Sequence, residues 1–92
     1  MDVTVEETET RGVFYAIENN EKIGEMTFSK AGTDRIIIDH TDVGDNWKGF
    51  GVGDFLVREA VNFAREKGIS IIPLCVFART VFEKNKELRD VL

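Results

Sequence analysis

The sequence predicts an α/β fold of the α+β type, with a mixed, mostly antiparallel five-stranded sheet and helices packed on it. Residues 3–43 consist of alternating, β-branched and aromatic segments separated by turn residues, which is the pattern of consecutive strands. A helical apolar pattern begins only near Gly53, and a short apolar segment and a second helical pattern follow it. The predicted order of elements is therefore β-β-β-β-α-β-α.

Four strands are expected in the first half, over residues 3–8, 12–19, 22–29 and 35–43. Asn19-Asn20 predicts a tight hairpin turn, because asparagine tolerates the left-handed backbone that such turns require. These strands should form an antiparallel meander. The continuous run from Ile36 to Ile38 predicts that the fourth strand is covered on both faces and lies in the centre of the sheet.

One helix, one strand and a final helix are expected in the second half. Apolar residues from Val52 to Ala64 recur at helical spacing, and Lys67 followed by Gly68 marks the end of this helix. Residues 69–74 predict a short strand that Pro73 should end or kink, because proline has no N–H. A helix is expected over residues 76–92. Since strand–helix–strand units are right-handed crossovers, the fourth and fifth strands should be parallel.

The composition limits the classes of protein to which the chain can belong. Its 92 residues, 42% of them hydrophobic and 32% charged, suit one globular domain spanning residues 1–92. No apolar run approaches the roughly 20 residues that cross a bilayer, and the acidic start lacks the apolar segment of a secretory signal. One cysteine and one histidine predict neither a disulfide nor a zinc site. No metal is therefore expected, and the default location is cytoplasmic.

Charge is distributed unevenly along the chain. Residues 1–45 contain eleven acidic and four basic residues, whereas residues 46–92 contain six acidic and eight basic ones. The net charge of -5 should repel nucleic acid and anionic membranes, so neither is expected as a partner. The second half could still hold a small anion, although a solvated acidic face explains the asymmetry as well.

The most informative segment is the glycine-rich stretch of residues 46–53, which lies between a strand and a helix. Gly49, Gly51 and Gly53 fall within five residues there. Glycines let backbone N–H groups approach a ligand closely, and the N–H groups and dipole at a helix N-terminus favour an anion. The segment is neither a Walker loop nor a dinucleotide fingerprint. A tight strand-to-helix turn without a ligand is the alternative.

The pattern Lys48-x-x-Gly51-x-Gly53 resembles the Arg/Gln-x-x-Gly-x-Gly/Ala motif of the GNAT superfamily of N-acetyltransferases, with lysine where arginine or glutamine is usual. The segments His40-Thr41-Asp42-Val43 and Pro73-x-Cys75 extend the resemblance to the small, single-domain YjdJ-type group, over residues 10–85. This resemblance implies a GNAT-like fold and acetyl-coenzyme A (acetyl-CoA) as co-substrate. It also implies that the fourth and fifth strands splay apart and that the thioester lies in the opening.

The same resemblance implies which residues hold the coenzyme. Backbone groups of Thr41, Asp42 and Val43 would pair with the pantetheine arm, and the loop over residues 48–53 would hold the pyrophosphate. On the last helix, Arg79 is preferred over Lys84 and Lys86 as the partner of the 3′-phosphate. The full set of expected cofactor-binding residues is Thr41, Asp42, Val43, Lys48, Gly49, Phe50, Gly51, Val52, Gly53 and Arg79. Phe50 is also expected to pack the loop onto the sheet, whereas the role of Trp47 is left open.

Cys75 and His40 are the candidate catalytic residues. Cys75 follows the fifth strand, near the expected thioester, where a thiolate could take the acyl group; simple packing of the thiol is the alternative. His40 is on the neighbouring strand and could act as a base for Cys75 or for an amine, or could be a structural histidine.

The sequence departs from longer superfamily members in ways that affect the acceptor site. Those members carry helices between the first two strands, further strands after the last helix, and often a tyrosine after the fifth strand as general acid. This chain has none of these, and its single tyrosine, Tyr15, lies on the second expected strand. The acceptor and the mechanism are therefore not implied by the resemblance.

Three functions remain open at this point. The favoured one is an acyl-CoA-dependent N-acyltransferase that moves acetyl from acetyl-CoA to an unidentified amine, with Cys75 as a possible carrier. The main alternative is a non-catalytic CoA-binding module. A small fold that acts only through protein contacts is the third. The expected state is a monomer or a homodimer.

Overall fold

The computed structural model describes all residues from 1 to 92 and contains one five-stranded sheet. The strands are β1 (Asp2–Glu7), β2 (Arg11–Glu18), β3 (Glu21–Ala31), β4 (Arg35–Val43) and β5 (Ser70–Pro73). Their order in the sheet is β1-β2-β3-β4-β5; β1 to β4 are antiparallel and β4 pairs with β5 in parallel. The predicted fold class and element order are confirmed.

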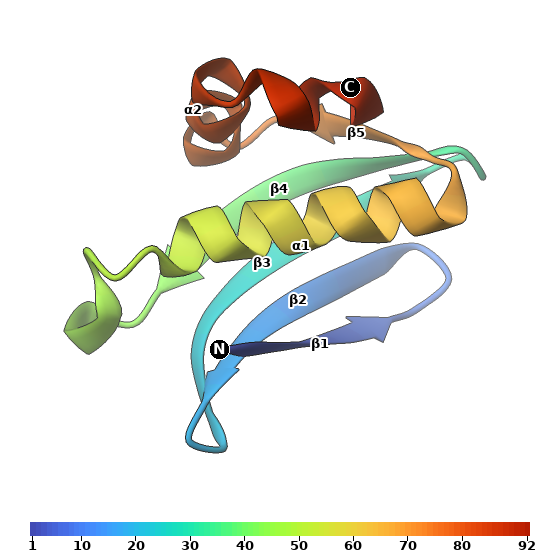
Figure 1. Cartoon of the computed structure of the whole chain (residues 1–92). Coiled ribbons are helices and arrows are strands. Elements are labelled where there is room, and N and C mark those ends of the chain that lie inside the picture. The colour runs from blue at the N-terminus through green and yellow to red at the C-terminus, as the bar shows by residue number, and fades with distance from the viewer.

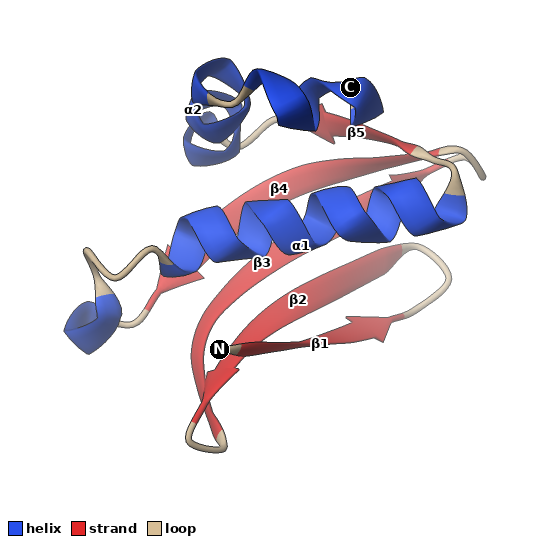
Figure 2. Ribbon diagram, in the orientation of Figure 1, coloured by secondary structure: helices blue, strands red, loops and turns tan.

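Helix α1 (Val52–Lys67) lies across one face of the sheet, and α2 (Val76–Lys84) lies beyond β5 (Figure 1). Two 3₁₀ turns, η1 (Asp45–Trp47) and η2 (Lys86–Val91), precede α1 and follow α2 (Figure 2). No helix has the length and apolar character needed to cross a membrane.

The core lies between the sheet and the two helices and consists of 19 buried hydrophobic residues. Its aromatic centre is built from β2, β3 and α1: the rings of Phe14 and Phe28 are 4.9 Å apart, and Phe14 meets Phe63 edge-on at 5.2 Å. Gly12 is the cross-strand partner of Phe28, and a Cβ on Gly12 would clash with the Phe28 ring. The ring therefore lies directly over the bare backbone of the neighbouring strand.

The predicted turn at Asn19-Asn20 and the predicted end of the first helix at Gly68 are both confirmed. Asn19 and Asn20 both have positive φ, at 50° and 64°, as the tight turn between β2 and β3 requires. Helix α1 ends at Gly68, whose φ is 67° and whose N–H bonds back to the last turn of the helix.

Two predictions about elements are wrong. The central strand is β3, whereas β4 is fourth of five and is covered on one face only, since Ile36 and Ile38 are buried and Ile37 is not. The last helix ends at Lys84, not at residue 92. Asn85 leaves the helical conformation at φ -130° and ψ 90°, and its side-chain Nδ2 donates to the carbonyl of Val81.

Strands β4 and β5 separate near Pro73. Their pairing ends at Ile38 and Pro73, and the N–H groups of Leu74 and Cys75 both donate to the single carbonyl of Ile38. Beyond this point residues 39–43 of β4 have no partner in β5. The edge of β4 is therefore left open beside the N-terminus of α2.

Candidate coenzyme-binding site

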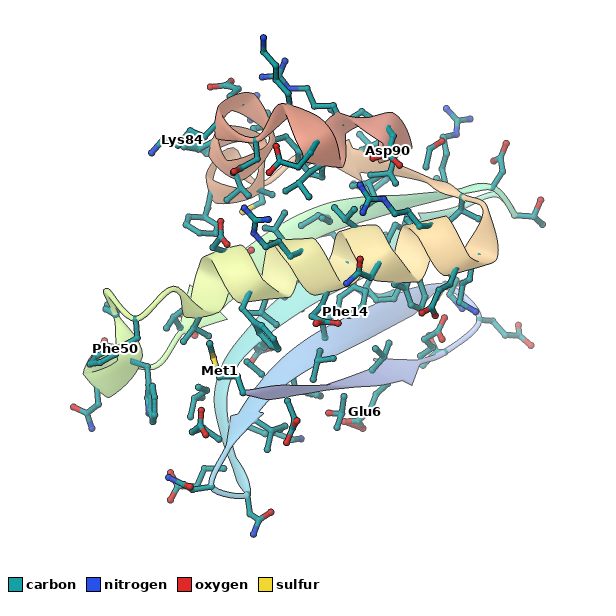
Figure 3. All side chains as sticks on the ribbon, viewed as in Figure 1. Met1, Glu6, Phe14, Phe50, Lys84 and Asp90 are labelled. Atoms are coloured by element: carbon teal, nitrogen blue, oxygen red, sulfur yellow. The ribbon has the colours of Figure 1, made fainter.

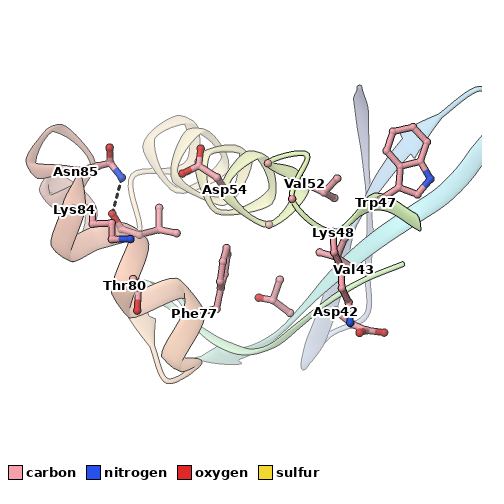
Figure 4. A pocket seen from close by; sticks show the side chains of 15 residues that line it. Asp42, Val43, Trp47, Lys48, Val52, Asp54, Phe77, Thr80, Lys84 and Asn85 are labelled. Atoms are coloured by element: carbon pink, nitrogen blue, oxygen red, sulfur yellow. Dashed lines mark hydrogen bonds between the residues drawn. The ribbon is translucent and has the colours of Figure 1, made fainter. Parts of the chain in front are cut away.

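The opening beyond Ile38 leads to a cavity of about 580 Å³, within the usual size range of small-molecule pockets. Its walls are the end of β4, the loop before α1, the first turn of α1 and one side of α2 (Figure 4). The lining residues are Thr41, Asp42, Val43, Trp47, Lys48, Gly49, Gly51, Val52, Gly53, Asp54, Phe77, Thr80, Val81, Lys84 and Asn85.

The three loop glycines serve two different purposes. Gly49 and Gly51 have φ values of 86° and 79°, in the left-handed region that residues with a Cβ rarely adopt, and a Cβ on either would point into open space. Gly53 has ordinary helical geometry, but a Cβ there would lie 2.5 Å from the Phe77 ring. The lack of a side chain at Gly53 thus lets Phe77 lie against the start of α1.

Backbone N–H groups without an acceptor are concentrated in this loop. The first helical hydrogen bond of α1 runs from Phe55 to Gly51, and no side chain caps the helix. Among residues 48–54 only the N–H of Phe50 donates within the chain, to the carbonyl of Trp47; those of Lys48, Gly49, Gly51, Val52, Gly53 and Asp54 have no acceptor there. Together with the positive end of the α1 dipole, they form a site that suits a multiply charged anion.

Charged side chains frame the cavity on both walls. Lys48 is exposed and lies 3.2 Å from Asp45, whereas Lys84 on α2 makes no ion pair. Asp54, in the first turn of α1, accepts a 2.7 Å hydrogen bond from Arg58. Nowhere in the structure do three or more metal-ligating side chains gather.

Cys75 lies at the N-terminus of α2, close to the cavity but outside its lining. Its Sγ is half-buried and lies 3.6 Å from the hydroxyl of Thr41, which does line the cavity. Burial disfavours the thiolate and is the largest single influence. It is outweighed by the N–H groups of Ala78 and Phe77 and by Thr41, so the pKa of Cys75 is lowered. A lowered pKa favours the thiolate, which is the nucleophilic form of cysteine.

His40 does not face Cys75, although the sequence offers it as a possible base for that residue. His40 is exposed and pairs across the strands with Thr27, whereas the next residue, Thr41, pairs with the fully buried Met26. Adjacent strand residues point to opposite faces, so His40 is on the sheet face that α1 does not cover. The residue that reaches Cys75 from β4 is Thr41.

Eight of the ten residues expected to bind the coenzyme line the cavity; the exceptions are Phe50 and Arg79. Phe50 is 67% exposed and its ring meets the Trp47 ring at 5.7 Å, so it does not pack the loop directly onto the sheet as expected (Figure 3). Trp47 is the residue that packs against the core. The guanidinium of Arg79 donates to the carbonyl of Leu74 at 3.2 Å instead of facing the cavity.

The sequence prediction missed the α2 wall. Phe77, Thr80, Val81 and Asn85 all contribute to it, and Lys84, not Arg79, is the basic residue of α2 that lines the cavity (Figure 4). The spacing of Phe77, Thr80, Val81 and Lys84 places them on one helix face, but nothing in the sequence shows that this face turns towards the glycine loop.

This architecture, with a splayed β4–β5 pair and a glycine loop leading into a helix, is that of the N-acetyltransferases. Residues 13–91 match the family model of the GCN5-related N-acetyl-transferases. The chain therefore belongs to the GCN5-related N-acetyltransferase family. A search of curated proteins found no match.

Solved structures support the same assignment. A GCN5-like protein of Staphylococcus aureus is 35% identical, with a TM-score of 0.70 over 96% of this chain and 85% of its own. The ribosomal-protein-alanine N-acetyltransferase of Brucella melitensis biovar Abortus 2308 shares the fold at 17% identity, with a TM-score of 0.70 over 84% of this chain.

A third similar structure was solved with acetyl-CoA bound. It comes from Bacillus anthracis str. Ames, is described as a streptothricin acetyltransferase, and is 23% identical with a TM-score of 0.64 over 84% of this chain. This chain spans 62% of the Brucella protein and 47% of the Bacillus protein. It thus corresponds to only part of these longer relatives.

Proposed function

We propose that this protein binds acetyl-CoA in the cavity beside α1 and transfers the acetyl group to an amine. The observation that carries this proposal is the set of six backbone N–H groups around the glycine loop that have no acceptor within the chain. A pyrophosphate has oxygens that can accept hydrogen bonds from these N–H groups, and its negative charge interacts favourably with the positive end of the α1 dipole. Membership of the GCN5-related family supplies the choice of coenzyme.

The remaining walls suit the rest of the coenzyme. The edge of β4 at Thr41–Val43 has no partner in β5, which leaves it available to an extended pantetheine arm. Lys84, unpaired on the opposite wall, suits a further phosphate and replaces Arg79 in that role. The Phe77 ring, which projects between α2 and α1, offers an apolar surface to the arm (Figure 4).

Cys75 is the proposed acyl carrier. Its thiolate would attack the thioester carbonyl; a bond from Sγ to the acyl carbon forms, the bond to the coenzyme sulfur breaks, and the departing thiolate takes a proton from solvent. The amine then attacks the acyl-cysteine, loses a proton to water, and releases Cys75 as thiolate. The lowered pKa of Cys75 supports this role. Direct attack of the amine on bound acetyl-CoA is the shorter route.

His40 retains a narrower candidate role as base. Its position on the uncovered sheet face suits an amine that approaches from that side, not deprotonation of Cys75.

A non-catalytic CoA-binding module is the second candidate. It is favoured by the position of the only tyrosine: Tyr15 is on β2 and pairs with Glu25 on β3, so it cannot serve as a general acid beside Cys75.

Intact-mass measurement after incubation with acetyl-CoA separates these possibilities. The carrier route predicts a gain of one acetyl group that disappears in Cys75→Ala and discharges when a panel of amines is added. Unchanged turnover in Cys75→Ala contradicts the carrier role and leaves direct transfer. Binding of acetyl-CoA without transfer to Cys75 or to any amine contradicts the enzyme and favours the module. Absence of binding contradicts both.

A further inference from the structure

Arg58 lies on α1 outside the cavity but joins two residues that line it. Its Nε donates to Oδ2 of Asp54 at 2.7 Å, and its Nη2 donates to Oδ1 of Asn85 at 3.0 Å. Asp54 belongs to the first turn of α1, and Asn85 ends α2. The guanidinium of Arg58 therefore connects the α1 wall of the cavity to its α2 wall.

Asp54 poses an electrostatic problem for the proposed ligand. Its own backbone N–H is one of the six free donors, so its carboxylate lies within one helical turn of the place where an anion would bind. A carboxylate in the first turn of a helix interacts favourably with the dipole, but it repels any other anion there. An unpaired Asp54 would thus compete with a pyrophosphate for the same positive end of α1.

The guanidinium of Arg58 counteracts this repulsion and is itself held in place. Asn85 uses its other side-chain atom, Nδ2, to donate to Val81 at 2.8 Å, and Arg58 also lies 3.9 Å from Glu87. Because Arg58 and Asp54 are 42% and 44% exposed, their ion pair contributes little to folding stability. The larger effect of this ion pair is on the neighbouring anion site, where it offsets the negative charge of Asp54.

We propose that Arg58 is a positioning residue that neutralises Asp54 and so makes the start of α1 able to accept the phosphates of the coenzyme. This inference rests on the proposed binding of CoA, and it concerns a residue that does not itself touch the ligand.

The test is a double-mutant cycle on CoA binding, measured by calorimetry at low and high salt. Arg58→Ala should weaken binding about tenfold at low salt, because the Asp54 carboxylate is then uncompensated in the helical turn where the phosphates are proposed to bind. Adding Asp54→Asn to Arg58→Ala should restore affinity to within about twofold, since the repelling charge is gone. The defect of Arg58→Ala should also shrink at 1 M salt, where the Debye length is about 3 Å.

Arg65→Ala is the matched control. Arg65 is also on α1, its side chain is 41% exposed, and it pairs with an aspartate of the C-terminal segment, Asp90, at 2.7 Å. It lies at the opposite end of the helix from the cavity, so its loss should leave CoA affinity within about twofold of the unaltered protein.

The outcomes are distinguishable. If Asp54→Asn fails to rescue Arg58→Ala, or if Arg65→Ala weakens binding as much, Arg58 acts only through folding and the inference is wrong. If the unaltered protein does not bind CoA, both the proposed function and this inference are wrong.

Discussion

Gly51→Ala is expected to weaken the binding of CoA by at least about tenfold, or 1.4 kcal/mol. Gly51 is the residue before α1 and has a φ of 79°. A Cβ there meets no protein atom within 4 Å, and Gly51 lines the cavity in which the pyrophosphate is proposed to bind, so an added methyl group has room only where the ligand would lie close. The substitution also strains the left-handed backbone by about 1–2 kcal/mol, which would displace the neighbouring N–H groups. Calorimetric titration with CoA measures the loss.

Gly68→Ala provides the control for backbone strain. Gly68 ends the same helix with a φ of 67°, and a Cβ there also meets nothing within 4 Å. Both substitutions should lower thermal stability to a similar extent, but only Gly51→Ala should lose CoA affinity. Equal affinities in the two variants would contradict the role assigned to Gly51.

Phe28→Ala is expected to lower the free energy of unfolding by about 3–5 kcal/mol. Phe28 is fully buried, stacks near Phe14 at 4.9 Å and approaches Phe63 at 5.8 Å. Its neighbour across the strands is Gly12, which has no side chain to fill the space that the ring leaves. A domain of this size has a total stability of about 5–15 kcal/mol, so the variant should be close to unfolding at 37 °C. Urea denaturation followed by circular dichroism measures the change.

Phe50→Ala is the matched control, because the same atoms are removed from a ring that is 67% exposed. Its effect on stability should stay within about 0.5 kcal/mol. A loss as large as that of Phe28→Ala would show that the aromatic centre under α1 is not the main source of stability.

The strands, the first helix and the glycine loop could be predicted because their signals are local. Hydrophobic spacing identified α1. Asparagine and glycine, which tolerate a positive φ, identified the Asn19-Asn20 turn and the helix end at Gly68, and the structure shows positive φ at all three. The position of the glycine loop between a strand and a helix indicated an anion site. None of these inferences needed knowledge of distant contacts.

The position of His40 could not be predicted, because it depends on an irregularity in the sheet. Simple alternation from Ile36 and Ile38 would place His40 on the core face with them. Instead the register shifts at this point: Phe28 pairs with Ile38 and Thr27 pairs with His40, so Asp39 is an extra residue. This single insertion moves His40 to the open face and brings Thr41 to Cys75.

Arg79 was preferred over Lys84, but only Lys84 lines the cavity, and this difference has a related reason. Both are basic residues on the last helix, and the sequence gives no information on how that helix rotates against α1. In the structure Ala78, Val81 and Phe82 are buried, which turns Lys84 towards the cavity and leaves Arg79 to bond the carbonyl of Leu74. Side-chain packing between distant elements settled this position.

The central claim is that main-chain N–H groups at the start of α1 hold the phosphates of the coenzyme, and amide NMR during a titration with CoA tests it most directly. Large, saturable shifts of the amide signals of Gly49, Gly51 and Gly53 are expected, with little change at Gly68. Binding of CoA that leaves those three signals in place, and shifts residues of the uncovered sheet face instead, would contradict it.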